Sequence, residues 1–253
     1  MFPHLFQQKK HDVTISMLHN KLETMYPQTS CHRLRQLLKS IKKSEAMQQH
    51  KERMAEFGKQ MSTVLNLENE EYSYRWDKPG SLQAIIADRK PLPKGITMET
   101  VAQIWKFANF KKTQIYSNHE VVKLSIGRFA KELIDQMQGK IDYDTNSNKN
   151  FQKAPHKMLL YVGHDSTIIP LLHLLHSFSK EEHWPPFGST VIFELYKDTS
   201  EEKKYYVRAT YNNKVLNIGG HDEYIEFEKL KEYVKPFVPV HYEHECLPLS
   251  HTE

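Results

Sequence analysis

The chain of 253 residues carries 35 lysines and arginines against 31 acidic residues, so its formal net charge at pH 7 is only +4 with histidine neutral. This charge is too small, and too evenly mixed along the sequence, to indicate a nucleic-acid partner. The mean hydropathy is −0.67, and no apolar run reaches the roughly 18 residues of a transmembrane helix. We therefore expect either one large domain or one domain with an insertion, and no membrane-spanning segment.

The N-terminus gives little information about the cellular compartment. Residues 1–6 are mostly apolar, but two glutamines and two lysines follow at once, so the stretch is too short for a secretory signal peptide. We expect either a cytosolic protein or a true N-terminus that lies further upstream. Two cysteines, Cys31 and Cys246, do not settle the redox compartment by their number.

Helical periodicity dominates the first half of the sequence. Residues 32–43 predict a basic helix with leucines and one isoleucine along one side, and residues 47–65 predict a second helix with a methionine-rich stripe. Such a stripe can form a partner groove, but packing onto a core is the interpretation we favour. Residues 96–110 predict a third helix. A Ser-x-x-Glu capping box at residues 117–120 opens a fourth, with Gly139 as its C-cap.

The second half of the sequence has the pattern of strands and helices that is typical of an α/β protein. Residues 158–162 (Met-Leu-Leu-Tyr-Val) form an unbroken apolar run, which predicts a strand covered on both faces. A glycine and a His-Asp pair follow, and then a leucine-rich helix. Residues 190–196 and 205–211 predict a β-hairpin, and residues 226–234 predict the last helix.

The His164-Asp165 pair is the candidate catalytic element. Ligands of α/β sheets bind beyond the C-terminal ends of strands, and a helix N-terminus offers free N–H groups to an anion. A histidine there can hold a phosphate oxygen, and an aspartate beside the anion can act as a general acid. The dipeptide alone fits equally well a loop histidine followed by a helix cap, because Asp165, Ser166 and Thr167 are all good N-caps.

Other histidines give weaker signals. A second His-Asp pair, His221-Asp222, follows two glycines without a preceding strand, and we interpret it as a turn. His173 and His176 have a spacing that suits a metal pair, but the sequence places no third ligand. We predict no metal site and no cofactor.

Three segments together resemble the C-terminal half of the histidine acid phosphatases. They are residues 159–167 around His-Asp-Ser-Thr, the Trp-Pro-Pro-Phe turn at residues 184–187, and residues 191–196, which end in Glu-Leu-Tyr. In order and spacing they match that family's strand ending in His-Asp-Thr, its Pro-Pro-aromatic turn and its Glu-Leu-Tyr strand. The resemblance extends over about residues 13–246, and the lysophosphatidic acid phosphatase-like branch is the most similar.

The resemblance implies roles for named residues. His164 would bind phosphate and Asp165 would protonate the leaving alcohol of a small phosphomonoester. The family's Arg-His-Gly-x-Arg-x-Pro segment, which carries the nucleophilic histidine, has no counterpart anywhere in this chain. The resemblance also implies a disulfide between Cys31 and Cys246, and with it the secretory pathway, a lysosome or the cell exterior. Free thiols would instead suit a cytoplasmic or mitochondrial protein.

The resemblance further implies a phosphoglycerate-mutase-like α/β sheet with flanking helices, truncated at its N-terminus. The core would comprise residues 1–31 and 113–253, and a helical cap would be inserted at residues 32–112. Three functional hypotheses remain open. The chain is a piece of a phosphomonoesterase, or a non-catalytic pseudophosphatase that binds a partner, or an unrelated scaffold with a chance match. The sequence does not indicate an oligomeric state.

Overall fold

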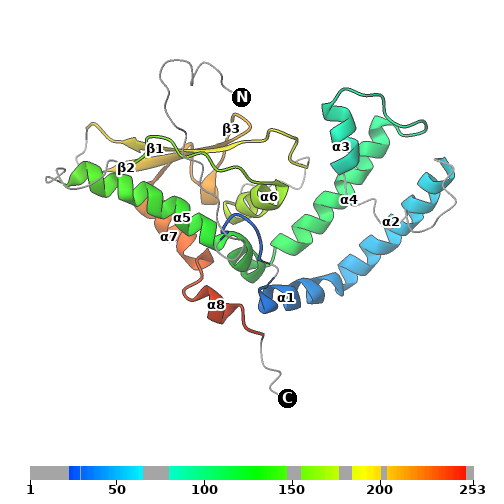
Figure 1. The fold of residues 1–253 in the computed structure, drawn as a ribbon, viewed down its shortest axis with the longest axis horizontal. Coiled ribbons are helices and arrows are strands. Elements are labelled where there is room, and N and C mark those ends of the chain that lie inside the picture. Colours follow the sequence, from blue (N-terminus) through cyan, green and yellow to red (C-terminus); the bar gives the residue numbers. More distant parts are fainter. Residues whose placement is uncertain are drawn as a thin grey trace.

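The structure is a computed structural model that describes residues 23–28, 30–64, 80–146, 155–176, 184–200 and 204–248. Figure 1 shows a small sheet with helices α5 and α7 beneath it, and helices α1 to α4 extending away from it to one side. Among the described residues, no helix is both long enough and apolar enough to cross a bilayer.

The extended side of the molecule is helical, as the periodicity predicts. It consists of α1 (His32–Lys42), α2 (Glu45–Val64), α3 (Gly80–Ala87) and α4 (Met98–Tyr116). Met47 and Met54 of the methionine-rich stripe are each only 7% exposed, and α2 packs against α4, so these two residues belong to the core. The side chains of residues 64 and 65 lie outside the described set. The short helix α3 was not predicted from the sequence.

Helix α5 (His119–Thr145) is longer than predicted, and its start is shifted by one residue. The N-cap is Asn118, whose side chain accepts a hydrogen bond from the Val121 N–H at 3.0 Å, and Ser117 is the C-cap of α4. The predicted capping box and the predicted C-cap at Gly139 are therefore wrong. The helix continues past the glycine because side-chain pairs four residues apart support its last turns, such as Lys140 with Asp144 at 2.8 Å.

The sheet is antiparallel and is built on the predicted hairpin. β1 (Val191–Lys197) pairs with β2 (Tyr205–Tyr211). The short strands β3 (Lys214–Val215) and β4 (Tyr224–Glu226) pair with the other side of β2. Among the described residues, β1 therefore has β2 as its only partner and forms an edge of the sheet.

The prediction of a buried strand at residues 158–162 is wrong. The segment belongs to no strand, and four of its five side chains are exposed, with Leu160 at 78% and Val162 at 80%. Only Tyr161 turns inward, where its ring meets Phe129 edge to face at 5.1 Å between centroids. The physical reason is that no described strand lies beside the segment to pair with its backbone, and a strand forms only with a partner.

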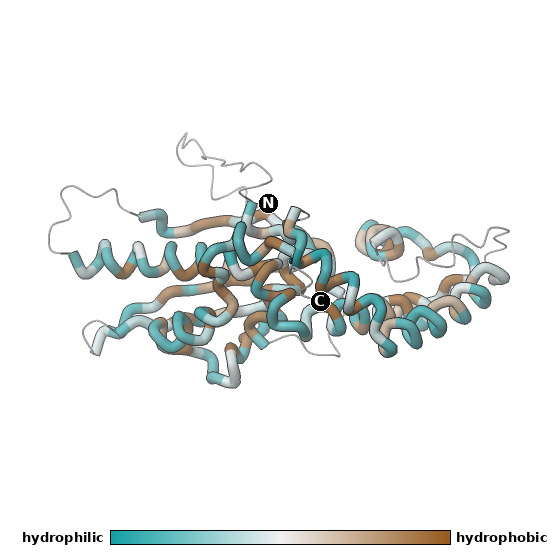
Figure 2. The backbone as a smooth tube through the Cα atoms, turned by 90° about the horizontal axis from the view of Figure 1, so that it is seen from below, coloured by the Kyte–Doolittle hydropathy of each residue, from teal (hydrophilic) through white to brown (hydrophobic). Residues whose placement is uncertain are grey.

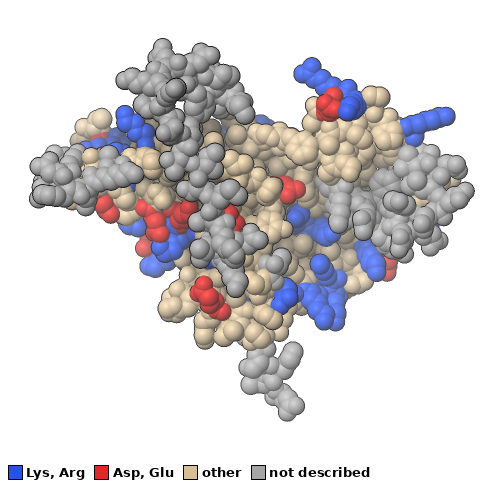
Figure 3. Space-filling view, viewed as in Figure 1, with Lys and Arg blue, Asp and Glu red and all other residues tan. Residues whose placement is uncertain are grey.

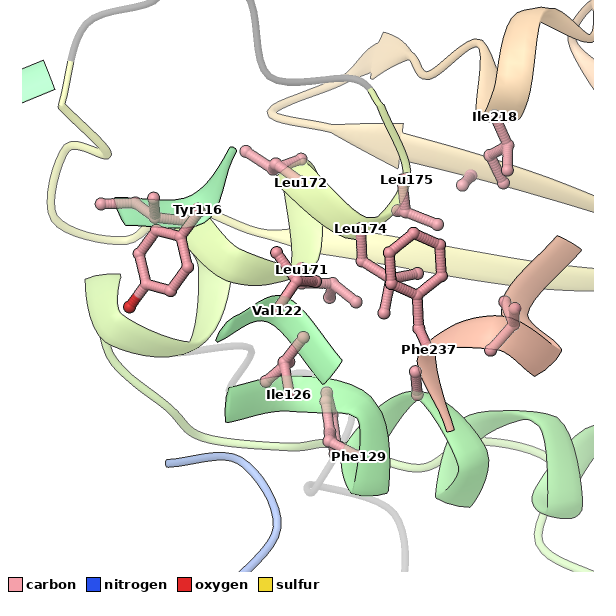
Figure 4. Close-up of a cluster of buried hydrophobic side chains, with 14 of the residues drawn as sticks. Tyr116, Val122, Ile126, Phe129, Leu171, Leu172, Leu174, Leu175, Ile218 and Phe237 are labelled. Atoms are coloured by element: carbon pink, nitrogen blue, oxygen red, sulfur yellow. The ribbon is translucent and has the colours of Figure 1, made fainter. Parts of the chain in front are cut away.

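The core is built from side chains of α5, α6 (Asp165–Leu174) and the sheet, together with those of α7 (Phe227–Val234) and η5 (Lys235–Phe237). Figure 4 shows Leu171 of α6 beside Val122 of α5, and Leu174 beside Phe237. In Figure 2 the apolar segments gather among the strands and the helices beside them. The mixed α/β class is as predicted. The chain then passes through α8 (Tyr242–Glu245), and η4 (Ile218–Gly220) connects β3 to β4.

Candidate active site

The His164-Asp165 pair lies at the N-terminus of α6, as the sequence predicts. His164 is the N-cap, with extended backbone angles of φ −130° and ψ 176°, and Asp165 is the first helical residue. The His164 carbonyl accepts the first helical hydrogen bonds, from the N–H groups of Thr167 at 2.9 Å and Ile168 at 3.1 Å. The cap is thus the histidine itself, and not one of the three residues after it.

Thr167 holds the entry to this helix in place. Its buried Oγ1 accepts a hydrogen bond from the His164 N–H at 3.2 Å. A β-carbon added at Gly163 would lie only 2.7 Å from the same Oγ1. Glycine is therefore required at residue 163, because any side chain would push the His-Asp pair away from the helix start.

The pair is accessible to a ligand. The His164 side chain is exposed, and Asp165 and Ser166 are half-buried. The first two N–H groups of α6, those of Asp165 and Ser166, have no partner within the helix, and the positive end of its dipole favours an anion at this point. An imidazole, a carboxyl and free N–H groups together suit a phosphate with a leaving oxygen that needs a proton.

The end of α4 contributes two further groups that the sequence did not single out for the site. Tyr116 is buried, and burial, followed by the negative charge of Asp165, raises the pKa of its phenol. The Lys112 Nζ lies 5.9 Å from the centre of the Tyr116 ring and 5.4 Å from that of Trp184. A lysine and a protonated phenol therefore lie on the side of the site that faces helix α4.

The Pro-Pro-aromatic turn connects this region to helix α3. Trp184 and Pro185 are buried, whereas Phe187 is 62% exposed. The buried Gln83 side chain of α3 donates a hydrogen bond to the Pro185 carbonyl at 2.6 Å. The turn therefore joins the helical extension to the part of the molecule that carries β1.

The second His-Asp pair forms a turn, as predicted. His221 and Asp222 are exposed and follow η4, and both glycines before them have positive φ angles of 58° and 82°. Neither residue lies at the start of a helix, so this pair lacks the N–H groups that His164 and Asp165 have beside them.

His173 of α6 and His176, which follows the C-cap of that helix, line a surface pocket. His173, His176 and His119 border a space of about 330 Å³ together with Phe237. Burial, and then the charge of His176, lowers the pKa of His173 to about 4. Within the described ranges, no three histidine, cysteine or carboxylate side chains are arranged to hold a metal ion.

The predicted disulfide between Cys31 and Cys246 is present. The two Cα atoms are 4.7 Å apart, and the bridge closes a sequence separation of 215 residues. It joins the N-cap of α1 to the C-cap of α8. Beside it, the Arg33 N–H donates a hydrogen bond to the Cys246 carbonyl at 3.0 Å, and the Arg33 guanidinium binds Glu120 of α5 through two nitrogens at 2.6 Å. The first helix is thus fixed to both α5 and the C-terminal segment.

Comparison with known proteins identifies the family. A model of the histidine phosphatase superfamily (branch 2) matches residues 3–212, so the chain belongs to this family. The chain is 32% identical over 97 residues to lysophosphatidic acid phosphatase type 6 from Mus musculus. These 97 residues make up 38% of this chain and 21% of the mouse protein.

Two relatives from Dictyostelium discoideum cover more of the chain. A probable acid phosphatase is 26% identical over 230 residues, which is 80% of this chain and 46% of that protein. Counting factor 60 is 25% identical over 130 residues, which is 51% of this chain and 28% of that protein. The chain therefore matches less than half the length of each of these relatives.

Proposed function

We propose that the chain carries the phosphate-binding and proton-donating half of an acid phosphatase active site. His164 would hold a phosphoryl oxygen, and Asp165 would give its proton to the leaving alcohol of a phosphomonoester. The observation that carries this proposal is the position of the pair at the N-terminus of α6, where free N–H groups and the helix dipole favour an anion. Membership of an acid-phosphatase-like family supports the same substrate class.

We also propose that the chain forms two domains, a catalytic core and a cap. Residues 1–31 and 113–253 would form the catalytic core, although residues 1–22 lie outside the described set, and residues 32–112 would form a cap. The contact of α3 with the Pro-Pro turn and the position of Lys112 beside Trp184 support a cap that borders the substrate. The boundary falls inside α4, so the cap would continue into the core through one helix.

The sequence of 253 residues supplies no nucleophile of the family type. In the reaction that the resemblance implies, a histidine nitrogen attacks phosphorus, and the bond from phosphorus to the leaving oxygen breaks as Asp165 protonates that oxygen. Water then cleaves the phosphohistidine. No Arg-His-Gly segment occurs in the chain. We therefore propose that these 253 residues alone do not turn over phosphomonoesters at an enzyme-like rate.

A non-catalytic role is the second candidate, and the same sequence observation favours it. A pseudophosphatase would keep the His164-Asp165 site to bind a phosphorylated ligand without cleaving it. Reading the transcript upstream of the codon for Met1 distinguishes the two candidates. An in-frame Arg-His-Gly-x-Arg segment would establish a catalytic parent, and a stop codon would establish the short protein.

The disulfide supports a location in an oxidising compartment, because cytosolic glutathione and thioredoxin keep most protein thiols reduced.

The similarity to the lysophosphatidic acid phosphatases supports a lipid phosphomonoester as substrate of the whole protein.

The acid role of Asp165 is tested in a fusion that places the nucleophile segment of a relative before this chain. Asp165→Asn should lower kcat by about 10²–10⁴-fold for alkyl phosphates, whose leaving alkoxides need a proton, and far less for activated aryl phosphates. Ser166→Ala, at the neighbouring position, serves as the control and should affect both substrates alike. Equal losses on both substrate types in Asp165→Asn would remove Asp165 from the acid role.

A further inference from the structure

Helix α1 presents a stripe of positive charge to the solvent. Arg35, Lys39, Lys42 and the C-cap residue Lys43 are all exposed, and α1 contains no acidic residue. At 3.6 residues per turn these four positions fall within an arc of about 100° and extend over about 12 Å. We call these four residues the basic stripe. Figure 3 shows the lysine and arginine side chains gathered over the position that α1 occupies in Figure 1.

Within the part of the chain that the structure describes, no acidic side chain neutralises the charge of the basic stripe. Among the described residues, none of the four forms an ion pair, and Arg35 instead contacts the ring of His32 at 3.0 Å. Arg33, on another side of the helix, is the residue that binds Glu120. The nearest acidic residue in sequence, Glu45, accepts a hydrogen bond from Gln49 at 3.1 Å on the following helix. The stripe is thus a local excess of about four charges on a chain whose net charge is +4.

The stripe is held as a fixed array. The apolar side of α1 is packed onto the core through Leu34, which is 2% exposed, and through three partly buried side chains. The disulfide at Cys31 and the Arg33–Glu120 pair fix the N-terminal end of the helix. The apolar side chains of α1 pack against the core, so none is left to insert into another apolar environment. The exposed side of α1 can therefore recognise a partner only by charge.

We propose that the basic stripe is a docking surface for an anionic membrane, and that it holds the protein at the lipid headgroups by charge complementarity. A membrane surface needs no shape complementarity, which suits a convex helix without a groove. A single-stranded nucleic acid would need aromatic side chains on which bases stack, and the stripe has none. Each lysine or arginine near such a surface contributes enough to change binding about fivefold.

Vesicle flotation tests the proposal, because protein that has aggregated does not float. The full chain is mixed with vesicles of phosphatidylcholine alone or with about 30 mol % phosphatidylserine. We expect binding only to the anionic vesicles at about 0.1 M salt, and loss of binding at about 0.5 M salt, because surface charges are then screened. Equal binding to both vesicle types would overturn the proposal.

Two matched variants locate the contact. Lys39→Gln/Lys42→Gln/Lys43→Gln should lower the partition coefficient on the order of a hundredfold. The control Lys197→Gln/Lys214→Gln/Lys229→Gln removes the same charge from exposed residues elsewhere and should change it far less. Equal losses in both variants would overturn the proposal, as would binding of a single-stranded RNA oligonucleotide that is tighter than vesicle binding and also depends on the stripe. Circular dichroism of both variants confirms that each remains folded.

Discussion

Gly127 of α5 lies against the backbone of η5 so closely that a β-carbon on Gly127 would overlap the carbonyl oxygen of Phe237. Helix α5 and η5 therefore meet backbone to backbone, and this contact brings the C-terminal segment under the core. Gly139, twelve residues further along the same helix, has no atom within 4 Å of the position of its β-carbon. Both glycines lie in α5, so alanine substitutions at the two positions differ mainly in whether the added methyl group meets η5.

Gly127→Ala is expected to destabilise the fold by about 1–3 kcal/mol or more, because backbone atoms must shift to admit the methyl group. Gly139→Ala should instead stabilise it by up to about 1 kcal/mol, because alanine favours a helix interior. Urea unfolding followed by circular dichroism measures both changes. Equal effects of the two substitutions would show that α5 and η5 are not in close contact.

The Cys31–Cys246 bridge closes a long loop, and its loss should lower the free energy of unfolding by about 2–5 kcal/mol. Cys31→Ser and Cys246→Ser should have similar effects, and the double variant should be no less stable than either single one, because each change breaks the same bond. Urea midpoints with and without a reductant provide the measurement. A wild-type protein that is indifferent to reduction would contradict the bridge.

The fold shows which features a sequence alone can predict. Local periodicity is sufficient for α1, α2, α4 and the β1–β2 hairpin, because those patterns depend on neighbours a few residues apart. Residues 158–162 have the composition of a buried strand, but burial depends on a partner strand that sequence periodicity does not supply. The start of α5 was misplaced because Ser117 and Asn118 are both good N-caps, and only the backbone decides between them.

The candidate site was predictable only in part. The position of His164 and Asp165 at a helix start follows from an apolar run, a glycine and good capping residues. Lys112 and Tyr116 lie about 50 residues upstream on a different helix, and no local pattern connects them with Asp165. The disulfide came from the family resemblance, since two cysteines 215 residues apart carry no spacing signal.

Acid should weaken the fold through His173. Its pKa is about 4 in the folded protein, against an ordinary value near 6.5. Between these values the unfolded chain binds more protons than the folded one, so stability falls as the pH drops from about 6.5 to 4. We expect His173→Gln to flatten this part of the stability profile, whereas His221→Gln, at an exposed histidine, should not. If the stability of His173→Gln and that of the wild type changed with pH in the same way, the lowered pKa of His173 would be contradicted.

The exposed apolar segment at residues 158–162 should make the chain prone to aggregation, since its backbone pairs with no strand among the described residues, and such a backbone with exposed apolar side chains favours strand addition. Leu160→Lys/Val162→Lys should lower light scattering without lowering the urea midpoint, because both side chains are exposed. Tyr161→Lys should instead lower the midpoint, because Tyr161 packs on Phe129. Unchanged scattering in the double variant would show that another surface drives association.

The most direct test of the central claim is the turnover number of the purified chain on a generic aryl phosphate at about pH 5, measured beside His164→Ala. We expect no enzyme-like turnover from either protein, because the 253 residues contain the proposed phosphate-binding and acid residues, His164 and Asp165, but no Arg-His-Gly segment. Turnover near the enzyme median of about 10 per second would contradict it. Such turnover persisting in His164→Ala would also remove the His164-Asp165 pair from the active site.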